Sequence, residues 1–96
     1  MSASTIVPKE VANLTLPTPF GGWETHAFEW EGSIHLCLCR GRIGEGEDVL
    51  VRMHSECVTG DALGSLGCDC GIQLRHAFRT IAAEGRGVLV YSTGHE

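Results

Sequence analysis

With 96 residues and a hydrophobic content of 43%, the chain suffices for one small globular domain, and its net charge of −5 argues against non-specific binding to nucleic acid. No stretch approaches the roughly 18 apolar residues that a membrane span requires, and the N-terminus lacks the apolar core of a secretory signal peptide. The five cysteines are an odd number, so they cannot all pair in disulfides within the chain. We therefore expect a reduced, cytoplasmic protein that contacts neither membranes nor nucleic acid.

The first half of the chain predicts a flexible terminus followed by two strands. Residues 1–15 carry little pattern and are expected to form a flexible N-terminus, and the prolines within residues 16–22 disfavour a helix there. Trp23–Trp30 contains aromatic and β-branched residues, and Ser33–Arg40 alternates cleanly in side-chain character. A turn at residues 31–32 would join the two segments, so we expect a β-hairpin.

The cysteines and histidines of these strands are interpreted as structural. Cys37 and Cys39 lie two residues apart, and therefore on one face of the second strand. That spacing permits metal binding, but buried free cysteine behaves as a small hydrophobic residue, so we interpret both as core residues. His26 and His35 are interpreted as partly exposed strand residues.

The second half of the chain predicts a strand, a loop, a helix and a further strand. Residues 41–47 are rich in glycine and glutamate and form a loop, and Asp48–Met53 is expected to be a strand. Apolar residues recur at helical spacing along Gly71–Glu84, and Gly85 is a typical helix terminator. Gly87–Tyr91 is a continuous apolar run, typical of a buried strand. The expected fold is α+β or α/β, with an N-terminal β-hairpin and a βαβ unit.

Three cysteines, Cys57, Cys68 and Cys70, lie between the expected strand and helix of that unit. Three thiolates supply three of the four ligands of a tetrahedral Zn²⁺ site, and an open fourth position is typical of a catalytic zinc. His54 as a fourth ligand would instead give a closed, structural site, and a third alternative is three buried thiols without a metal. Because two of the cysteines lie at the expected start of the helix, its dipole should lower their pKa values.

Two polar residues flank the cysteine loop. Arg52 is near the end of the preceding strand, where α/β sheets bind ligands, and it would clamp a phosphate or carboxylate; the alternative is an exposed arginine. Gln73 lies on the expected first turn of the helix, where it would either read a base edge or be solvated.

Several runs resemble the GTP cyclohydrolase II family, whose enzymes open riboflavin biosynthesis. The most specific are VLVRMHSECVTGD at residues 49–61 and GSLGCDCGIQL at residues 64–74. The resemblance continues through AEGRGVLVY at residues 83–91 and GHE at residues 94–96, and LPTPFG at residues 16–21 is similar to the opening of the family. It therefore implies that residues 16–96 form a GTP cyclohydrolase II-like domain.

The resemblance implies a zinc hydrolase that opens the imidazole ring of GTP, with formate, diphosphate and a diaminopyrimidinone ribosyl phosphate as products. It assigns the zinc to Cys57, Cys68 and Cys70, where the metal activates water for attack at C8. Mg²⁺ is expected to assist at the phosphates. The residues implied to contact GTP are Arg52, Met53, His54, Ser55, Glu56, Gln73 and Glu96.

The family continues beyond the position of Glu96 into a second half that supplies an arginine nucleophile and an aspartate proton acceptor. The resemblance thus implies a fold truncated at its C-terminus and a catalytic site that is incomplete in these residues. The alternative is a non-catalytic zinc- and GTP-binding remnant or degenerate paralogue. The strand at Gly87–Tyr91 would then be an exposed apolar edge, so we also expect homodimers or other self-association.

Overall fold

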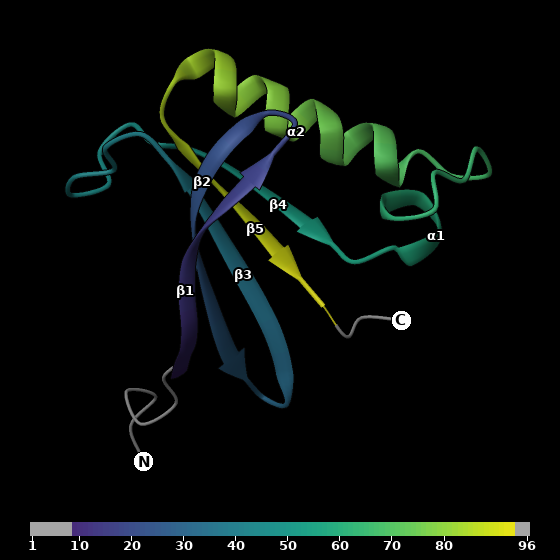
Figure 1. Cartoon of the computed structure of the whole chain (residues 1–96), viewed down its shortest axis with the longest axis horizontal. Helices are drawn as coiled ribbons and strands as arrows, with labels where there is room; N and C mark the ends of the chain where they lie inside the picture. Colours follow the sequence, from purple (N-terminus) through teal and green to yellow (C-terminus); the bar gives the residue numbers. More distant parts are fainter. Residues whose placement is uncertain (1–8, 94–96) are drawn as a thin grey trace.

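The computed structural model describes residues 9–93, without the side chain of Thr59, as a mixed five-stranded sheet with a long helix across one face (Figure 1). The strands lie in the order β1-β2-β3-β5-β4. Neither helix in the described part of the chain is long and apolar enough to cross a membrane. The elements are β1 (Lys9–Thr18), β2 (Gly21–Trp30), β3 (Ser33–Arg40), β4 (Leu50–Ser55), α1 (Val58–Asp61), α2 (Cys70–Glu84) and β5 (Gly87–Ser92). This arrangement confirms an α+β fold.

The predicted hairpin is formed by β2 and β3, which pair antiparallel from Trp30↔Ser33 to Glu24↔Cys39. Glu31 and Gly32 connect them with positive φ values of 53° and 80°. Two consecutive residues with positive φ match the right-handed twist of the adjoining strands, so this tight turn sets the register of the hairpin.

Strand β1 occupies residues that the sequence analysis expected to be flexible. Residues 9–15 form its first part and pair with β2, so that expectation is wrong for them; residues 1–8 lie outside the described part of the chain. The strand carries no buried residue, which explains why the sequence showed no apolar alternation. Pro17 is tolerated because β1 is an edge strand, where a missing N–H group need not break the ladder.

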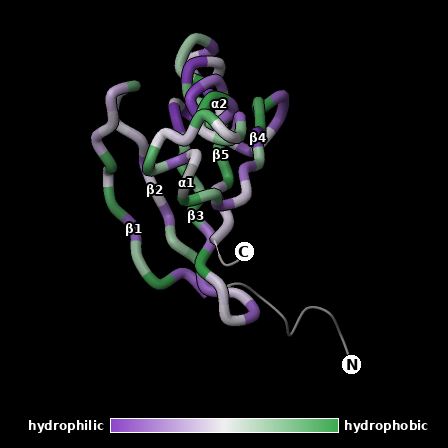
Figure 2. The backbone as a smooth tube through the Cα atoms, turned by 90° about the vertical axis from the view of Figure 1, so that its right-hand side faces the viewer, coloured by the Kyte–Doolittle hydropathy of each residue, from purple (hydrophilic) through white to green (hydrophobic). Residues whose placement is uncertain are grey.

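The βαβ unit consists of β4, α2 and β5, whose two strands pair in parallel from Leu50↔Gly87 to Ser55↔Ser92. Strand β4 begins two residues later than predicted and extends to Ser55. Because β5 lies between β3 and β4, it is an interior strand, and the expectation that it forms an exposed edge is wrong. Figure 2 places the true edges, β1 and β4, at opposite sides of the sheet.

The core lies between α2 and the sheet. Trp23, Ile81 and Leu89 are fully buried, from β2, α2 and β5 respectively. The ring of Phe78 on α2 stacks on Phe20 at 5.3 Å between centroids and meets Trp23 edge-on at 5.2 Å. Each such apolar side chain contributes about 1.5–3 kcal/mol on full burial, so this contact layer holds α2 at a defined place on the sheet.

The opposite face of the sheet carries Cys37 and Cys39, because side chains alternate along β3 and its leucines face α2. Both thiols are half-buried and lie outside the core cluster, so their interpretation as core residues is wrong. Partial burial raises the pKa of both thiols. Neither belongs to the cysteine cluster described below.

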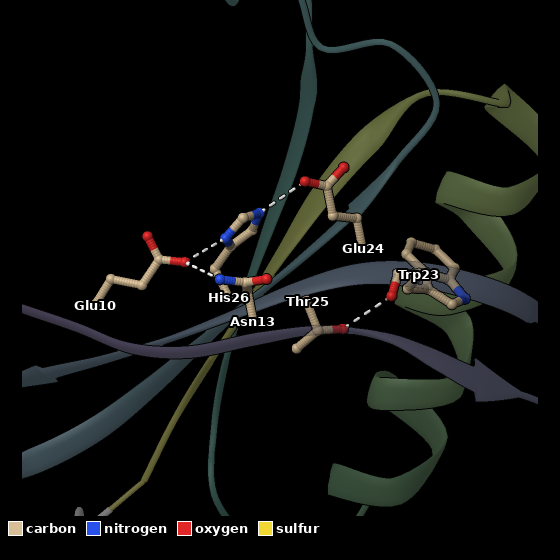
Figure 3. Close-up of polar contacts among 6 residues, drawn as sticks. All are labelled: Glu10, Asn13, Trp23, Glu24, Thr25 and His26. Carbon is tan, nitrogen blue, oxygen red and sulfur yellow. Dashed lines mark hydrogen bonds and ion pairs between the residues drawn. The ribbon is translucent and has the colours of Figure 1, made fainter.

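The side chain of His26 on β2 contacts Glu10 on β1 and Glu24 on β2, as Figure 3 shows. Its Nδ1 lies 2.8 Å from a carboxylate oxygen of Glu10 on β1, and its Nε2 lies 3.0 Å from one of Glu24. The hydrogen bonds to Glu10 and then to Glu24 raise the pKa of His26. His26 therefore stabilises the β1–β2 pairing by charge as well as by hydrogen bonding.

Candidate metal and substrate site

The three cysteines of the loop converge where the parallel strands end. After Ser55 the chain enters α1, whose N-cap is Cys57, and then a loop that leads through Cys68 to Cys70, the first residue of α2. Figure 1 shows α1 and the start of α2 beside the ends of β4 and β5. Sheets of this kind bind ligands at the carboxyl ends of their parallel strands, because the loops there project beyond the sheet.

The geometry of the cluster fits a single zinc ion. The sulfur atoms of Cys57, Cys68 and Cys70 all lie within 4.8 Å of one another, and those of Cys57 and Cys68 are 3.8 Å apart. Two sulfurs bound tetrahedrally at about 2.3 Å from Zn²⁺ would be separated by about 3.8 Å. Within residues 9–93 the cluster consists of these three cysteines and does not include His54.

Two glycines allow the cysteines to approach so closely. A Cβ atom at Gly60 would lie 2.9 Å from the sulfur of Cys68, and one at Gly71 would overlap the carbonyl oxygen of Gly60. Real Cβ atoms do not tolerate such contacts, so any larger residue would push α1 away from the start of α2. Close backbone packing of the two helices is therefore a condition for the cluster.

The neighbouring thiols suppress the ionisation of Cys70. Hydrogen bonding with Cys57, partial burial and the proximity of Cys68 raise the pKa of Cys70 to about 12. The expectation that the helix N-terminus lowers this pKa is therefore wrong for Cys70, because hydrogen bonding with Cys57 and partial burial favour the neutral thiol. A divalent cation reverses the balance, since it stabilises every thiolate at once.

Asp61 joins the cluster to the sheet. Its side chain is only 5% exposed, and it accepts hydrogen bonds from the hydroxyl of Tyr91 at 2.7 Å, the backbone N–H of Cys57 at 3.0 Å and Nε2–H of His54 at 2.9 Å. Burial raises the pKa of Asp61, but the three donors outweigh it, so the net shift is downward. The charged carboxylate thus fixes the loop at Cys57 against β4 and β5.

Most of the predicted substrate-binding residues line a hollow between β4 and α2. Arg52, Met53, His54 and Gln73 all line it, and its volume is about 470 Å³. Arg52 and His54 face the helix because side chains alternate along β4. Gln73 bonds Asp69 on the first turn of α2, at 3.0 Å between amide nitrogen and carboxylate oxygen.

The remaining predicted residues lie elsewhere. Ser55 is exposed at the end of β4, and the side chain of Glu56 is half-buried next to Cys57. The backbone N–H of Glu56 donates to the carbonyl oxygen of Ser92 at 2.8 Å, which extends the pairing of β4 with β5. Glu96 lies outside the described residues.

Sequence reasoning assigned no role to four residues around the site. Asp61 belongs to the family motif at residues 49–61, which could have drawn attention to it. No sequence pattern near either residue predicts that the hydroxyl of Tyr91 donates a hydrogen bond to Asp61. His76 and Arg79 line the hollow, and their spacing of three residues on α2 was the available signal. Each of these contacts depends on how α2 and β5 pack beside β4.

A mixed sheet with three cysteines close together at the ends of its parallel strands defines an α+β domain with a candidate metal site. Comparison with known families matches residues 9–96 to the family described as GTP cyclohydrolase II. The chain belongs to this family, which confirms the resemblance seen in its motifs.

Individual relatives agree with this assignment. The chain is 57% identical over 83 residues to GTP cyclohydrolase-2 of Hahella chejuensis and 58% identical over 83 residues to that of Azotobacter vinelandii, covering 84% of this chain and 40% of each relative. It is 49% identical over 88 residues to the riboflavin biosynthesis protein RibBA of Salinispora tropica, covering 90% of this chain and 22% of the relative. The chain thus spans less than half the length of these relatives.

Among the solved structures that match, one covers nearly the whole of this chain. It is RibBX of A. baumannii, a two-domain 3,4-dihydroxy-2-butanone 4-phosphate synthase, with a TM-score of 0.51 and 22% identity. The match covers 93% of this chain and 23% of that protein. At this identity the similarity supports the architecture alone.

Proposed function

We propose that the chain is the zinc- and substrate-binding part of a GTP cyclohydrolase II, which hydrolyses GTP to formate, diphosphate and a diaminopyrimidinone ribosyl phosphate. The observation that carries the proposal is the cysteine triad within 4.8 Å, next to a hollow lined by Arg52, His54 and Gln73. The names of the relatives support the chemistry: GTP cyclohydrolase-2 for two of them and a riboflavin biosynthesis protein for a third.

Cys57, Cys68 and Cys70 would hold the zinc, which when bound supplies a Lewis acid that activates water for attack at C8 of the guanine. The residues of the chain bind and orient the substrate. Gln73, one turn from Cys70, lines the same hollow, and an amide side chain suits a base edge. Orientation of this kind lowers a barrier by holding the reacting atoms in place, by up to about 7–11 kcal/mol.

The remaining predicted contacts are Met53, Ser55, Glu56 and Glu96, with Mg²⁺ at the phosphates. We propose Met53 as a wall of the hollow, since it is 74% exposed beside Arg52. Ser55 and Glu56 continue directly from β4 toward Cys57, which would place them near a ligand bound at the cluster. For Glu96 and Mg²⁺ the family resemblance is the support.

We also propose a reducing, cytoplasmic setting and self-association. None of the five cysteines forms a disulfide, which fits a compartment where thiols stay reduced. Self-association would use β4, an edge strand with two exposed apolar side chains, Val51 at 48% and Met53 at 74%.

The test is formate and diphosphate release from GTP by the zinc-loaded chain, with Cys68→Ser as the control against contaminants. We expect release by these residues, which span 40% of the Azotobacter relative, to be slower than release by that relative. Slow release that depends on Cys68 supports a catalytic role. GTP binding with no release at all favours the non-catalytic remnant, and failure to bind either zinc or GTP overturns the proposal.

A further inference from the structure

Four metal-ligating side chains lie together on the face of the sheet opposite α2, and we call them the hairpin cluster. The β2–β3 register pairs Glu24 with Cys39 and His26 with Cys37. Paired residues of antiparallel strands project from the same face with Cβ atoms about 4.5–5.5 Å apart, and alternate residues of one strand lie about 6.5–7 Å apart. The hairpin cluster therefore gathers two thiols, an imidazole and a carboxylate around one small area of the sheet.

The imidazole of His26 already has the orientation of a metal ligand. In Figure 3 it lies between two carboxylates, with Nδ1 at 2.8 Å from Glu10 and Nε2 at 3.0 Å from Glu24. In the tautomer that carries its proton on Nδ1, His26 donates this proton to Glu10. A carboxylate in that position is a common partner of a metal-binding histidine, because it fixes the tautomer and the direction of the ring. Nε2 is then left to coordinate an ion on the side of Glu24.

The spacing of His26 and Glu24 suits two ligands of one ion. A nitrogen and an oxygen bound at about 2.0–2.1 Å from a tetrahedral Zn²⁺ are about 3.3 Å apart. The distance between Nε2 and the carboxylate oxygen of Glu24 is 3.0 Å, so an ion needs only a small separation of the two groups. The side chain of Glu24 is 70% exposed, which gives an ion access from solvent.

The two thiols of the hairpin cluster lie next to these groups. Burial, and then the proximity of Cys37 and Glu24, raises the pKa of Cys39, which reflects how near the three groups are to one another. On the other side of β3, the strand β5 places Val90 beside Cys37 and Val88 beside Cys39. These apolar side chains limit the access of solvent to the thiols, a condition that also favours thiolate bonding to an ion.

We propose that Glu24, His26, Cys37 and Cys39 form a second metal site, which takes a tetrahedral divalent ion such as Zn²⁺. Binding displaces the protons of the two thiols and of Nε2. Within residues 9–93 only the loop cysteines have three ligand atoms that already lie within 4.8 Å of one another. The second site closes by rotation of its two thiols, so it is the weaker one and fills only when metal exceeds one equivalent. The inference is independent of the proposed function.

The experiment is a titration with Co²⁺ of the chain that has first been loaded with one equivalent of Zn²⁺. A second equivalent should bind and give the absorption band of thiolate-bound cobalt, while metal analysis still finds the first Zn²⁺ in place. Cys37→Ser and Cys39→Ser should each abolish the second equivalent. Both variants should keep the first equivalent of Zn²⁺ at the loop cysteines, which shows that they are folded.

A second pair of variants tests the carboxylate behind His26. Glu10→Gln should weaken binding of the second ion about tenfold, a usual effect of losing the partner of a ligating histidine. Glu29→Gln is the matched control, because it removes the same charge from an exposed position of β2 on the other face of the sheet. It should change the affinity less than twofold.

Three results would overturn the second site. One is the absence of a thiolate–cobalt band in the zinc-loaded wild-type chain. Another is a second equivalent that persists in both Cys37→Ser and Cys39→Ser, which would be an adventitious ion only. The third is equal weakening by Glu10→Gln and Glu29→Gln, which would reveal a diffuse attraction of cations to an acidic chain. Each of these results leaves the zinc at the loop cysteines, and with it the proposed function, unaffected.

Discussion

The hydroxyl of Tyr91 donates to the carboxylate of Asp61 at 2.7 Å, which connects the interior strand β5 to the helix that follows Cys57. The parallel register sets Tyr91 directly beside His54, whose ring stacks on the phenol at 5.5 Å between centroids. Burial and the adjacent carboxylate raise the pKa of Tyr91, so it remains a donor across the physiological range. Hydrogen bonds from Tyr91 on β5 and from His54 on β4 hold the carboxylate of Asp61 in place, and this carboxylate in turn positions Cys57.

Removing the carboxylate charge should loosen the metal site. In Asp61→Asn the backbone N–H of Cys57 and the Tyr91 hydroxyl lose their charged acceptor, and we expect zinc affinity to fall about 10–100-fold, the usual effect of a residue that supports a ligand. Competition with a chromophoric chelator measures the affinity. The Co²⁺-loaded variant should also show a shifted absorption spectrum, which general destabilisation would not produce. Unchanged affinity and spectrum would rule out a positioning role for Asp61.

The hydrogen bond between Tyr91 and Asp61 should contribute to stability by itself. Tyr91→Phe removes one donor to a charged acceptor, so we expect the free energy of unfolding to fall by about 1.5 kcal/mol. Urea denaturation measures it, and a double-mutant cycle with Asp61→Asn should show coupling of about 0.5–3 kcal/mol. Thr80→Ala is a control for loss of a hydroxyl whose hydrogen bond, to the carbonyl oxygen of His76, is exposed, and it should cost little. Additive effects in the cycle would contradict a direct interaction.

Zinc should bind at a ratio of one per chain and require the loop cysteines. Cys57→Ser, Cys68→Ser or Cys70→Ser each removes a sulfur from the triad and should abolish stoichiometric zinc in metal analysis of the purified chain. Cys37→Ser and Cys39→Ser are matched controls on the opposite face of the sheet, and both should retain the metal. Zinc lost from either control but kept by Cys68→Ser would place the metal elsewhere.

Alanine at Gly71 should destabilise the metal site although it favours the helix. In an open helical position this change would gain roughly 0.5–1 kcal/mol, but here the added Cβ overlaps the carbonyl oxygen of Gly60. We expect weaker zinc binding and a lower free energy of unfolding in Gly71→Ala. Gly67→Ala serves as the control, because its Cβ would meet only Ser65, at 3.4 Å. A stabilised Gly71→Ala with unchanged zinc affinity would show that α1 and α2 are not tightly packed there.

The pairing of β1 with β2 should weaken as pH rises. His26 has a pKa raised above 6.5 by Glu10 and Glu24, so its contribution is complete below pH 6.5 and is lost as pH increases through the raised value. Glu10 has a pKa lowered below 4.5 by His26, and its contribution is lost as pH falls through that lowered value. In His26→Gln, the free energy of unfolding, measured by urea denaturation at successive pH values, should fall less steeply as pH rises than it does in the wild type. The loop variant Glu45→Gln should leave the slope unchanged, and equal slopes in wild type and His26→Gln would contradict the ion pair.

Self-association, if it uses the β4 edge, should respond to charge on that strand. Val51 is 48% exposed on β4, and a lysine there would oppose pairing with another chain. We expect Val51→Lys to lower the average mass in light scattering at high micromolar concentration. Lys9 on the other edge strand offers a control, since Lys9→Gln should not reduce the mass. A wild-type chain that stays monomeric over this concentration range would contradict the proposal.

The sequence alone determined the elements whose pattern is local. Alternation in Ser33–Arg40 and the helical spacing of Gly71–Glu84 predicted β3 and α2 within one residue, because side-chain periodicity follows directly from backbone geometry. The cysteine spacing likewise predicted which three thiols meet, and the motifs indicated the family.

The tertiary structure decided what depends on partners far apart in the chain. β1 has no buried residue, so it is held in place by backbone hydrogen bonds to β2. Such bonds leave no periodic pattern in the sequence from which the strand could be predicted. The place of β5 between β3 and β4 brings Tyr91 to Asp61 and His54, and the packing of α2 on β4 brings Arg79 into the same hollow as Arg52. Strand order and helix packing are chosen by the total burial and hydrogen bonding of the folded chain, which no local stretch of sequence encodes.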